Sequence, residues 1–447
     1  ILAIRFNSGS YALATLTADW QRFSVSQTAI VGTFDIALRP AIGSSSGTVS
    51  IFVWGAQLEA GDIATDYIPT TTAAVSVGPV ANVPRLDYLG STCPRLLLEG
   101  QRSNLMLQSE NLSASWSQIR STATINAAVS PDGYANADKL IANTDASTTH
   151  FVIQTITSPA AGTYAYSTFF KKSEYNFGCV RISTNTDVQR FTAVVNLTTG
   201  EVTATSSFGS PTATSTKVDN YGNGWYRLSV TCGHTLGNIL CVSTLSPTAV
   251  PTFTNNIPAF TGDGTSGVFT WGAQLEAGSY ATSYIPTLSA SATRGADAAS
   301  KTGISSLIGQ TEGVLFVDFT VDTISAQTND PVLCYMKDGG VGERYVQLYS
   351  TGNLRYLENN GATIATITKT GLSVGRHKCA IAYANNDMVF YVDGVQIGTD
   401  TSGTPSGFST FALQYYNAAY LGQQKVNQAL LFKTRLTNAE LATLTTL

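Results

Sequence analysis

The residues of this chain that could carry acid–base chemistry are few and far apart. Hydrolysis of a glycosidic bond needs two carboxylates held on either side of that bond. Glu312 and Asp318 are six positions apart (318 − 312 = 6), and Glu343 and Glu358 each stand alone in the sequence. The sequence also has no P-loop for nucleotide phosphates. We therefore expect no catalytic residues, no enzymatic activity and no cofactor.

Histidine and cysteine, the usual ligands of zinc, do not have the spacing of a metal site. The three histidines are scattered, and no two cysteines form a CxxC pair. We interpret His150 and His377 as ordinary residues near strand starts, and the cysteines as small buried apolar residues. Cys232 and Cys241 flank the turn-like run Gly-His-Thr-Leu-Gly-Asn, so pairing across a hairpin stays open. The six cysteines are Cys93, Cys179, Cys232, Cys241, Cys334 and Cys379.

Three aspartates on predicted turns are the best candidates for calcium ligands. They are Asp387, Asp393 and Asp400. An isolated aspartate in a turn usually accepts hydrogen bonds from its own backbone. We therefore predict no metal site.

The best candidate for a ligand site is a run of tyrosines near the end of the chain. A sugar offers an apolar face and a rim of hydroxyls, which aromatic rings beside Asn or Asp side chains can bind. Tyr415, Tyr416 and Asn417, with Tyr420 close by, have this composition. We predict that they bind carbohydrate; the alternative is that these tyrosines only pack the core of their domain.

The composition of the chain favours many short strands joined by polar turns. Of its 447 residues, only 12% are charged, against about 25% in ordinary globular proteins, and 39 are glycines. The formal net charge is −4, and no cluster of Lys and Arg is present, which argues against nucleic acid as a partner. No run reaches the roughly 20 apolar residues of a membrane span. Because the sequence starts at Ile1, in what reads as mid-domain, we expect it to be part of a longer chain.

An internal repeat sets the expected domain boundaries. Residues 52–70 read FVWGAQLEAGDIATDYIPT and residues 269–287 read FTWGAQLEAGSYATSYIPT, so 15 of the 19 positions agree. Upstream, WQRFSV at residues 20–25 corresponds to WYRLSV at residues 225–230. We interpret the signature as a core strand, with Trp, Ala and Leu on one face, followed by an apolar clamp that Pro ends. Its predicted structural residues are Trp54, Leu58, Tyr67 and Pro69 in the first copy, and Trp271, Leu275, Tyr284 and Pro286 in the second.

Alternating runs and turn residues divide the rest of the chain. The predicted segments are the C-terminal half of a module at 1–70, an extended linker at 71–106, a complete module at 107–287, a flexible linker at 288–310 and a last sandwich at 311–447. In GTYAYSTFF the period-2 face is Tyr164, Tyr166, Thr168 and Phe170. The run Asn385-Asn386-Asp387 predicts a hairpin turn. Thr437 and Glu440 have the spacing of a capping box, which predicts a short C-terminal helix.

Three runs together resemble a module of tailed-phage tail-fibre, tailspike and head-fibre proteins. They are LLLEGQRSNLMLQSENLSASW (96–116), NGWYRLSV (223–230) and WGAQLEAGSYATSYIPT (271–287). The resemblance spans residues 100–287 fully and 1–70 in part, and Gly100 stands where such modules often carry Pro. It implies a fold similar to carbohydrate-binding jelly rolls.

The last domain resembles concanavalin A-like and laminin-G-like sandwiches through HKCAIAYANNDMVFYVDGVQIG (377–398) and LTNAELATL (436–444). We therefore predict an all-β chain: a partial and a complete jelly-roll sandwich, then a concanavalin A-like β-sandwich with a short C-terminal helix. The resemblance implies a bacteriophage fibre or spike on the virion surface. Its partners would be copies of itself, usually in a trimer, other virion proteins and host cell-surface polysaccharide. The alternative is a purely structural decoration or connector of spacer and oligomerisation modules.

Overall fold

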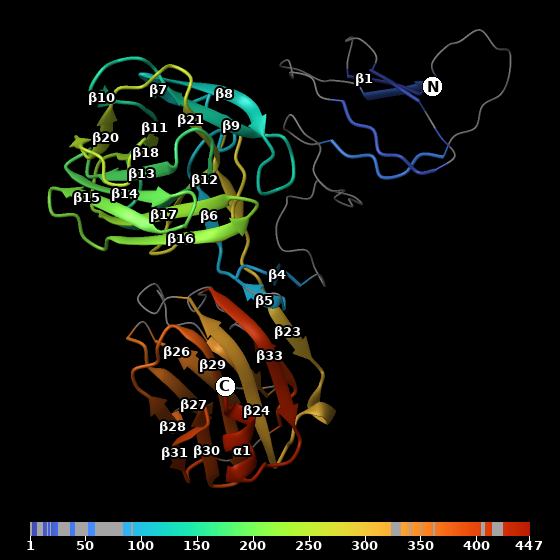
Figure 1. The fold of residues 1–447 in the computed structure, drawn as a ribbon. Coiled ribbons are helices and arrows are strands. Elements are labelled where there is room, and N and C mark those ends of the chain that lie inside the picture. Colours follow the sequence, from blue (N-terminus) through green and yellow to red (C-terminus); the bar gives the residue numbers. More distant parts are fainter. Residues whose placement is uncertain are drawn as a thin grey trace. The chain divides into compact units, whose positions relative to one another are not determined.

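The computed structural model describes most of the chain beyond residue 83 and short segments before it (Figure 1). The described ranges are 2–6, 12–15, 17, 19–25, 36–40, 52–58, 84–90, 93–322, 332–338, 340, 342–349, 351–360, 363–403, 407–413 and 423–447. The chain divides into two compact units, Ile1–Val77 and Gly78–Leu447. Within the described ranges the fold is antiparallel β-sheet with one α-helix at the C-terminus, which confirms the predicted all-β class. No helix in these ranges is long and apolar enough to cross a membrane.

The first unit contains a small antiparallel sheet with the strand order β2-β1-β3. Its strands are β1 (Leu2–Phe6), β2 (Ala12–Ala14) and β3 (Ile36–Pro40). Residues 20–25 and 52–58, which belong to the first repeat copy, lie outside this sheet and have no assigned secondary structure.

The second unit begins with a sandwich of two six-stranded sheets, coloured cyan to yellow in Figure 1. One sheet has the order β15-β14-β13-β18-β11-β7, and the other β16-β17-β12-β21-β9-β8. The strands of the first sheet are β7 (Ser117–Ile119), β11 (Phe151–Ile156), β13 (Phe177–Thr184), β14 (Gln189–Asn196), β15 (Val202–Phe208) and β18 (Ile239–Ser246). Those of the second are β8 (Ser121–Ala128), β9 (Ala137–Ala142), β12 (Gly162–Lys172), β16 (Ser215–Gly222), β17 (Trp225–His234) and β21 (Gly267–Ala277).

Short strand pairs close this first sandwich. They are β10 (Thr148–Thr149) and β19 (Phe253–Thr254) on either side of β20 (Ile257–Phe260), and β6 (Arg102–Asn104) paired with β22 (Ala292–Arg294). Alternate side chains of β12 fill part of the core. Tyr164, Tyr166 and Phe170 are buried between the two sheets, as the period-2 pattern predicts.

The last sandwich, orange and red in Figure 1, pairs a six-stranded sheet with a seven-stranded sheet. The first has the order β23-β32-β25-β26-β27-β28 and the second β31-β30-β29-β24-β33-β5-β4. The strands of the first are β23 (Ala299–Thr302), β25 (Val332–Lys337), β26 (Gly342–Leu348), β27 (Leu354–Asn360), β28 (Thr363–Lys369) and β32 (Thr410–Leu413). Those of the second are β4 (Leu86–Asp87), β5 (Arg95–Leu98), β24 (Glu312–Val321), β29 (Gly375–Ala384), β30 (Asp387–Val392), β31 (Val395–Asp400) and β33 (Gln424–Phe432).

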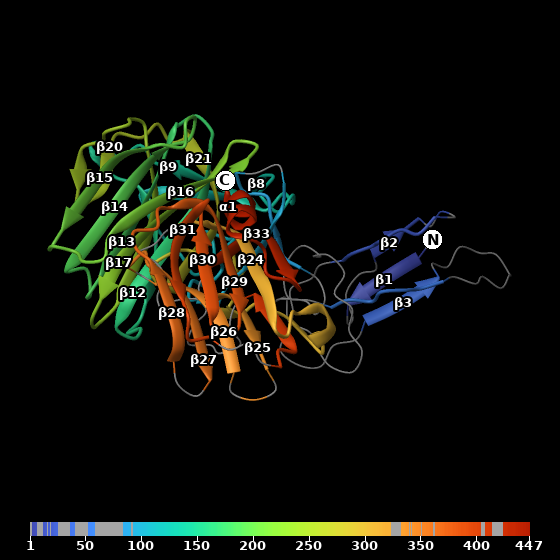
Figure 2. The same cartoon turned by 90° about the horizontal axis from the view of Figure 1, so that it is seen from below.

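The C-terminal helix α1 (Asn438–Thr445) covers the outer face of the seven-stranded sheet (Figure 2). Leu441 is buried there in a second apolar cluster with residues of β24 and β29. The Thr437 side chain accepts from the backbone N–H of Glu440 while the Glu440 carboxylate accepts from that of Thr437, which confirms the capping box. The predicted hairpin is also present, since Ala384 pairs with Asp387 across a two-residue turn.

Segments predicted as linkers contribute strands of the second unit. Within 71–106, β5 pairs with β33 and extends the sheet of the last sandwich, and within 288–310, β23 pairs with β32. The run Arg95–Leu98 is apolar enough for this because Leu97 and Leu98 are buried. A short 3₁₀ turn, η1 (Ser305–Leu307), follows β23.

None of the cysteines forms a disulfide in the described part of the chain, and all except Cys93 are buried. This agrees with the interpretation of five of them as small apolar residues. Cys232 and Cys241 do not pair, because β17 and β18 belong to opposite sheets of the first sandwich rather than to one hairpin. Burial raises the pKa of Cys334 to about 12, so this thiol stays protonated at neutral pH.

Candidate functional site

The predicted carbohydrate-binding residues Tyr415, Tyr416, Asn417 and Tyr420 lie outside the described residues. The strand that precedes them, β32, is described up to Leu413 and pairs with β25 in the last sandwich. Their role therefore remains a prediction from the sequence.

The second copy of the repeat signature forms a strand at the centre of a sheet. β21 lies between β12 and β9, and Leu275 is fully buried in the main core. Trp271 is also buried, but it belongs to a separate cluster on the outer face of the sheet. The prediction that Trp271 and Leu275 share one face is therefore wrong. The cause is a β-bulge opposite Ser167 and Phe169, where Gly272 has a φ of 65°, so the residue parity changes between Trp271 and Ala273.

The polar residues of the signature are buried rather than exposed, because the chain folds back over them. The Oε1 atom of Gln274 accepts from the backbone N–H of Ile285 at 2.7 Å. The carboxylate of Glu276 accepts from the backbone N–H of Thr282 at 2.8 Å and from its hydroxyl at 2.5 Å. Burial raises the pKa of Glu276, and the positive charge of Arg227 opposes that rise. We call residues 278–287 the clasp.

A second segment, far away in sequence, locks strand β21 and the clasp together. The side-chain amide of Asn104 donates to the carbonyls of Ala273 (3.1 Å) and Ile285 (2.8 Å), and its oxygen accepts from the N–H of Leu275 (3.1 Å). The Ser109 hydroxyl lies 2.6 Å from the Tyr284 hydroxyl, and it accepts from the N–H of Thr287. Pro286, predicted to end the clamp, is exposed. The segment from Asn104 to Ser109 and the run YIPT of the signature therefore form one interlocked unit.

The first copy of the signature is exposed where it is described. The exposed fraction of Trp54 is 73%, against 6% for Trp271, and that of Leu58 is 51%, against 0% for Leu275. Trp54 and Leu58 were predicted to lie in a core strand, and this prediction is wrong, because residues 52–58 have no strand pairing in the described part of the first unit. Tyr67 and Pro69 lie outside the described residues.

Two carboxyl groups, those of Glu110 and Asp138, have pKa values well above their ordinary range. Burial, with a smaller contribution from the negative charge of Asp132, raises the pKa of Glu110 to about 7. Burial likewise raises the pKa of Asp138 to about 6, although Asp138 accepts hydrogen bonds from two backbone N–H groups. Glu110 accepts from the Tyr284 hydroxyl at 3.2 Å and from the side-chain amide of Asn136 at 3.2 Å. These contacts tie Glu110 to the clasp.

A buried ion cluster holds the start of the first sandwich to the segment after the clasp. The Glu99 carboxylate accepts from Arg85 at 2.7 Å and from the N–H of Ser283 at 3.0 Å. Arg294 lies 3.4 Å from Glu99, and Asp297 accepts from Arg85. Burial acts to raise the pKa of Glu99, but the charges of Arg294 and Arg85 outweigh it and hold the pKa below its ordinary value.

The candidate calcium ligands each have other partners. Asp393 accepts from the backbone N–H of Lys378 at 2.9 Å and contacts a ring nitrogen of His377 at 2.6 Å. Asp387 pairs with Arg435 at 2.7 Å, and Asp400 accepts from the N–H of Ser402. No group of three or more His, Cys, Asp or Glu residues within the described ranges could hold a metal ion.

The histidines and acidic residues considered for catalysis also have structural partners. The two ring nitrogens of His150 lie 2.7 Å from the carbonyl of Arg120 and 3.1 Å from that of Phe260. Asp318 pairs with Arg376, and Glu358 forms a buried two-contact pair with Arg344 at 3.0 Å each.

Two glycine patterns of the sequence have spacings typical of catalytic or nucleotide-binding loops. Residues 262–267, Gly-Asp-Gly-Thr-Ser-Gly, match a dinucleotide-binding loop, which opens a helix. Here they connect β20 to β21, two strands, and Asp263 accepts from the N–H groups of Thr265 and Ser266 inside the turn. The pattern is therefore a strand-to-strand turn. Residues 43–47, Gly-Ser-Ser-Ser-Gly, have the spacing of a nucleophile elbow and lie outside the described residues.

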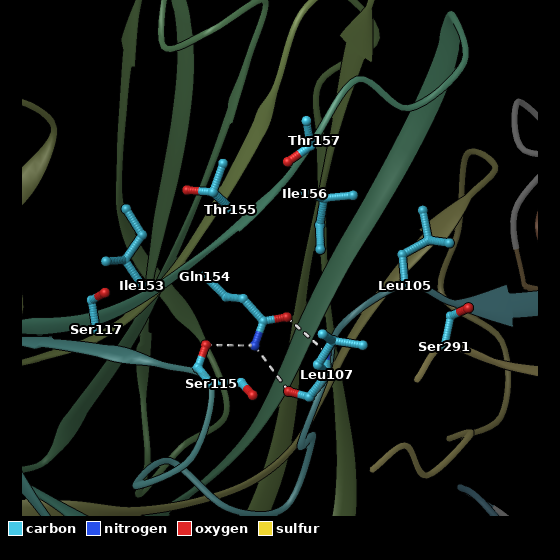
Figure 3. A pocket seen from close by; sticks show the side chains of 10 residues that line it. All are labelled: Leu105, Leu107, Ser115, Ser117, Ile153, Gln154, Thr155, Ile156, Thr157 and Ser291. Carbon is cyan, nitrogen blue, oxygen red and sulfur yellow. Dashed lines mark hydrogen bonds between the residues drawn. The ribbon is translucent and has the colours of Figure 1, made fainter. Parts of the chain in front are cut away.

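Within the described residues, a pocket at the edge of the first sandwich is a candidate for ligand binding (Figure 3). Its volume is about 540 Å³, within the usual range of small-molecule sites. We call it the edge pocket, because β7 pairs with β11 only as far as Ile153 and the following residues of β11 line the cavity. The lining side chains are Leu105, Leu107, Ser115, Ser117, Ile153, Gln154, Thr155, Ile156, Thr157 and Ser291.

The edge pocket combines aliphatic surface with hydroxyl groups and holds no charged side chain in its lining. Figure 3 shows Gln154 fixed between two lining segments. Its amide donates to the carbonyls of Leu107 (2.9 Å) and Ser115 (3.2 Å), and its oxygen accepts from the N–H of Leu107 (2.7 Å). The pocket therefore has a fixed wall. No local pattern in the sequence predicts the pocket, because its lining comes from segments that are far apart in the chain.

Comparisons with known proteins returned solved structures only. No protein-family model and no curated protein sequence matches the chain. The sialidase carbohydrate-binding domain of Ruminococcus gnavus, described as "IT-sialidase CBM40", matches at 12% identity over 34% of this chain and 95% of its own, with a TM-score of 0.28. The "Binding domain of Botulinum Neurotoxin DC in complex with SialylT" matches at 14% identity over 30% of this chain and 35% of its own, with a TM-score of 0.25. A heptameric pentraxin of Limulus polyphemus matches at 10% identity over 31% of this chain and 70% of its own, with a TM-score of 0.26. These proteins are similar to this chain in β-sandwich fold, and similarity of this degree carries no argument about its function.

Proposed function

We propose that this chain is a non-enzymatic attachment protein of a bacteriophage particle, a fibre or spike on the virion surface that binds host surface glycans. The edge pocket is the observation that supports this proposal most directly. A sugar ring has apolar C–H faces and hydroxyl edges, and the pocket pairs leucine and isoleucine side chains with serine and threonine hydroxyls. Its size fits one or two sugar rings.

The sequence resemblance to phage fibre modules adds the biological setting to this proposal. In that setting the chain acts as a homo-oligomer, a trimer by analogy with such fibres, joined to other virion proteins. The predicted tyrosine site at 415–420 would add a second glycan-binding position in the last sandwich.

A specific observation favours a second candidate function, that of a structural connector. The repeated signature is buried and interlocked in its complete copy, where Leu275 and Gln274 have no exposed surface. A motif repeated along the chain for packing alone is what a spacer requires. The two candidates differ in whether the folded protein binds a glycan at all.

The test is glycan binding by the full chain, measured by calorimetric titration with host surface polysaccharide. Thr155→Trp places a large ring in the edge pocket, because the exposed Thr155 lines it. Thr205→Trp is the matched control, since Thr205 is exposed on β15 at the opposite edge of the same sheet. A third variant combines Tyr415→Ala with Tyr416→Ala.

Saturable binding that Thr155→Trp removes and Thr205→Trp keeps would assign the glycan to the edge pocket. Binding that only the tyrosine variant loses would move the site to the last sandwich. A folded protein with no saturable binding would leave the connector as the function.

A further inference from the structure

The hydroxyl groups of the edge pocket are open to a ligand. Five of its ten lining residues carry a hydroxyl, and all five residues are exposed. Within the described residues, none of these hydroxyl groups forms a hydrogen bond with the protein. The five are Ser115, Ser117, Thr155, Thr157 and Ser291. Because a hydroxyl both donates and accepts, this set matches the hydroxyl rim of a sugar ring.

The amide group of the pocket, that of Gln154, is already committed to the protein. The exposed fraction of Gln154 is 6%. Its nitrogen donates to the carbonyls of Leu107 and Ser115, and its oxygen accepts from the N–H of Leu107. Figure 3 shows the amide held between these two segments, with Thr155 and Thr157 farther along β11. Both amide hydrogens are therefore used, and the lining side chains keep no N–H group for a ligand.

Charge is absent from the lining and also from the sequence around it. The lining residues belong to four segments of the chain, and none of these segments contains Asp, Glu, Lys or Arg. The segments are 103–109, 111–119, 151–170 and 277–293. The pocket is therefore built from uncharged stretches of the sequence.

The charged residues that border these segments do not line the pocket. They are Arg102, Glu110, Arg120, Lys171, Glu276 and Arg294. Arg120, which follows the segment with both serines, donates to the carbonyl of Thr149 at 2.7 Å and to its hydroxyl at 2.6 Å. Arg294, which follows Ser291, donates to the carbonyl of Gly100 at 2.9 Å. An ionised ligand would therefore lose water in the pocket without gaining a counter-charge.

We propose that the edge pocket binds neutral sugar residues and discriminates against acidic ones, the uronic and sialic acids. This inference rests on the proposed function and names the class of glycan that the same site takes. Removing a carboxylate from water is costly without a compensating charge or N–H donor. Sites that select carboxylates use the guanidinium group of Arg, which donates two parallel hydrogen bonds. A neutral ring instead needs only hydroxyl partners and an aliphatic surface for its C–H face, and the pocket has both.

The test compares three forms of one host surface polysaccharide on the full chain by calorimetric titration. The first is the native polymer. In the second, carbodiimide and borohydride have reduced every carboxylate to a primary alcohol. In the third, the primary alcohols have been oxidised to carboxylates. The polymers differ in charge, while their linkages stay the same.

Four protein variants locate the effect in the pocket. Thr155→Trp fills the pocket, and Thr155→Arg adds a guanidinium group to it, because the exposed Thr155 is part of the lining. Thr205→Trp and Thr205→Arg are the matched controls, since Thr205 is exposed on β15 at the opposite edge of the same sheet.

We expect the reduced polymer to bind at least as tightly as the native one, and the oxidised polymer to bind about tenfold or more weakly. Thr155→Trp should remove binding of the reduced polymer, and Thr205→Trp should keep it. Thr155→Arg should strengthen binding of the oxidised polymer by about tenfold, because its guanidinium can pair with the carboxylate. Thr205→Arg should not.

The possible failures of this inference and of the proposed function are distinguishable. Binding that is lost on reduction, or oxidised polymer that binds as tightly as the reduced one, would overturn the neutral-sugar assignment and leave glycan binding in place. Binding that Thr155→Trp keeps would place the glycan outside the edge pocket and would also overturn the assignment. If the folded protein binds none of the three polymers, the proposed function itself is wrong.

Discussion

Glu110 makes the stability of the first sandwich depend on pH in a direction that can be calculated. Its carboxyl group is partly buried between Tyr284 of the clasp and Asn136, and the charge of Asp132 lies nearby. Burial, with that charge, raises the pKa of Glu110 from 4.5 to about 7. The folded state therefore binds this proton more tightly than the unfolded state does. The contribution of Glu110 to the free energy of unfolding is full below pH 4.5 and is lost as the pH rises to about 7.

The magnitude follows from the size of the pKa difference. A difference of 2.5 between about 7 and 4.5, at about 1.4 kcal/mol for each pKa unit, corresponds to about 3 kcal/mol. Glu110→Gln removes the charge and keeps an oxygen for the Tyr284 hydroxyl. Its new amide can donate to the Oδ1 atom of Asn136, which is buried without a hydrogen-bond partner. The variant should therefore be more stable than the unchanged protein by up to about 3 kcal/mol at about pH 8 and about equally stable at about pH 4.5.

Urea unfolding followed by tryptophan fluorescence measures this difference, because Trp116, Trp225 and Trp271 are buried in the first sandwich. Glu201→Gln, at an exposed carboxylate of the same sandwich, is the matched control and should give the same small change at both pH values. A Glu110→Gln variant whose advantage over the unchanged protein does not grow between about pH 4.5 and about pH 8 would refute the reasoning.

Three further predictions concern the packing of the two sandwiches, and urea unfolding measures each. Leu275→Ala should lower the free energy of unfolding by about 2–5 kcal/mol, because the leucine is buried. Leu58→Ala, at the same position of the exposed first copy, should change it by no more than about 0.5 kcal/mol. Equal effects of the two substitutions would contradict the difference in burial. Asn104→Leu should cost at least about 3 kcal/mol, because it leaves several buried backbone groups without a partner at about 1–3 kcal/mol each; a loss under about 1 kcal/mol would show that the interlock is dispensable. Arg344→Met should lower the free energy of unfolding by about 3–5 kcal/mol, because it removes the ion-pair partner of the buried Glu358 carboxylate. Adding Glu358→Leu should restore most of that stability.

Much of the fold could be predicted because its strands follow period-2 patterns closely. β12 has tyrosines and a phenylalanine at alternate positions, and these side chains fill the main core. The capping box of Thr437 and Glu440 and the two-residue turn before Asp387 are local signals, and the structure has both. Local physical chemistry decides these features, so the sequence is enough to find them.

The pattern fails where one residue changes the parity of a strand or where a distant segment covers a face. Gly272 introduces a bulge, so Trp271 and Leu275 point to opposite faces although an unbroken strand would place them together. Gln274 and Glu276 are polar residues between the apolar positions of the strand, yet the clasp buries them through hydrogen bonds. Alternation specifies which residues share a face, but it does not specify what lies on the other side.

The candidate ligand site was harder to predict than the fold for a similar reason. A tyrosine-rich run is visible in one dimension, whereas the edge pocket is made by Leu105 and Leu107, the end of β11 and Ser291, which are close only after folding. None of these residues is unusual by itself. Only the point where β7 stops pairing with β11 distinguishes them.

The central position of β21 has a consequence for the order of events during synthesis. β12 and β9 precede it in the chain, yet they meet only through β21, and Asn104 contacts Leu275 across 171 residues (275 − 104 = 171). At roughly 5–20 residues per second, a ribosome takes roughly 10–30 s to make that stretch. During this interval the growing chain has two apolar strands with open edges and no central partner, a state that favours wrong pairing with neighbouring chains. Several copies made on one messenger would therefore meet before any of them can close its sheet.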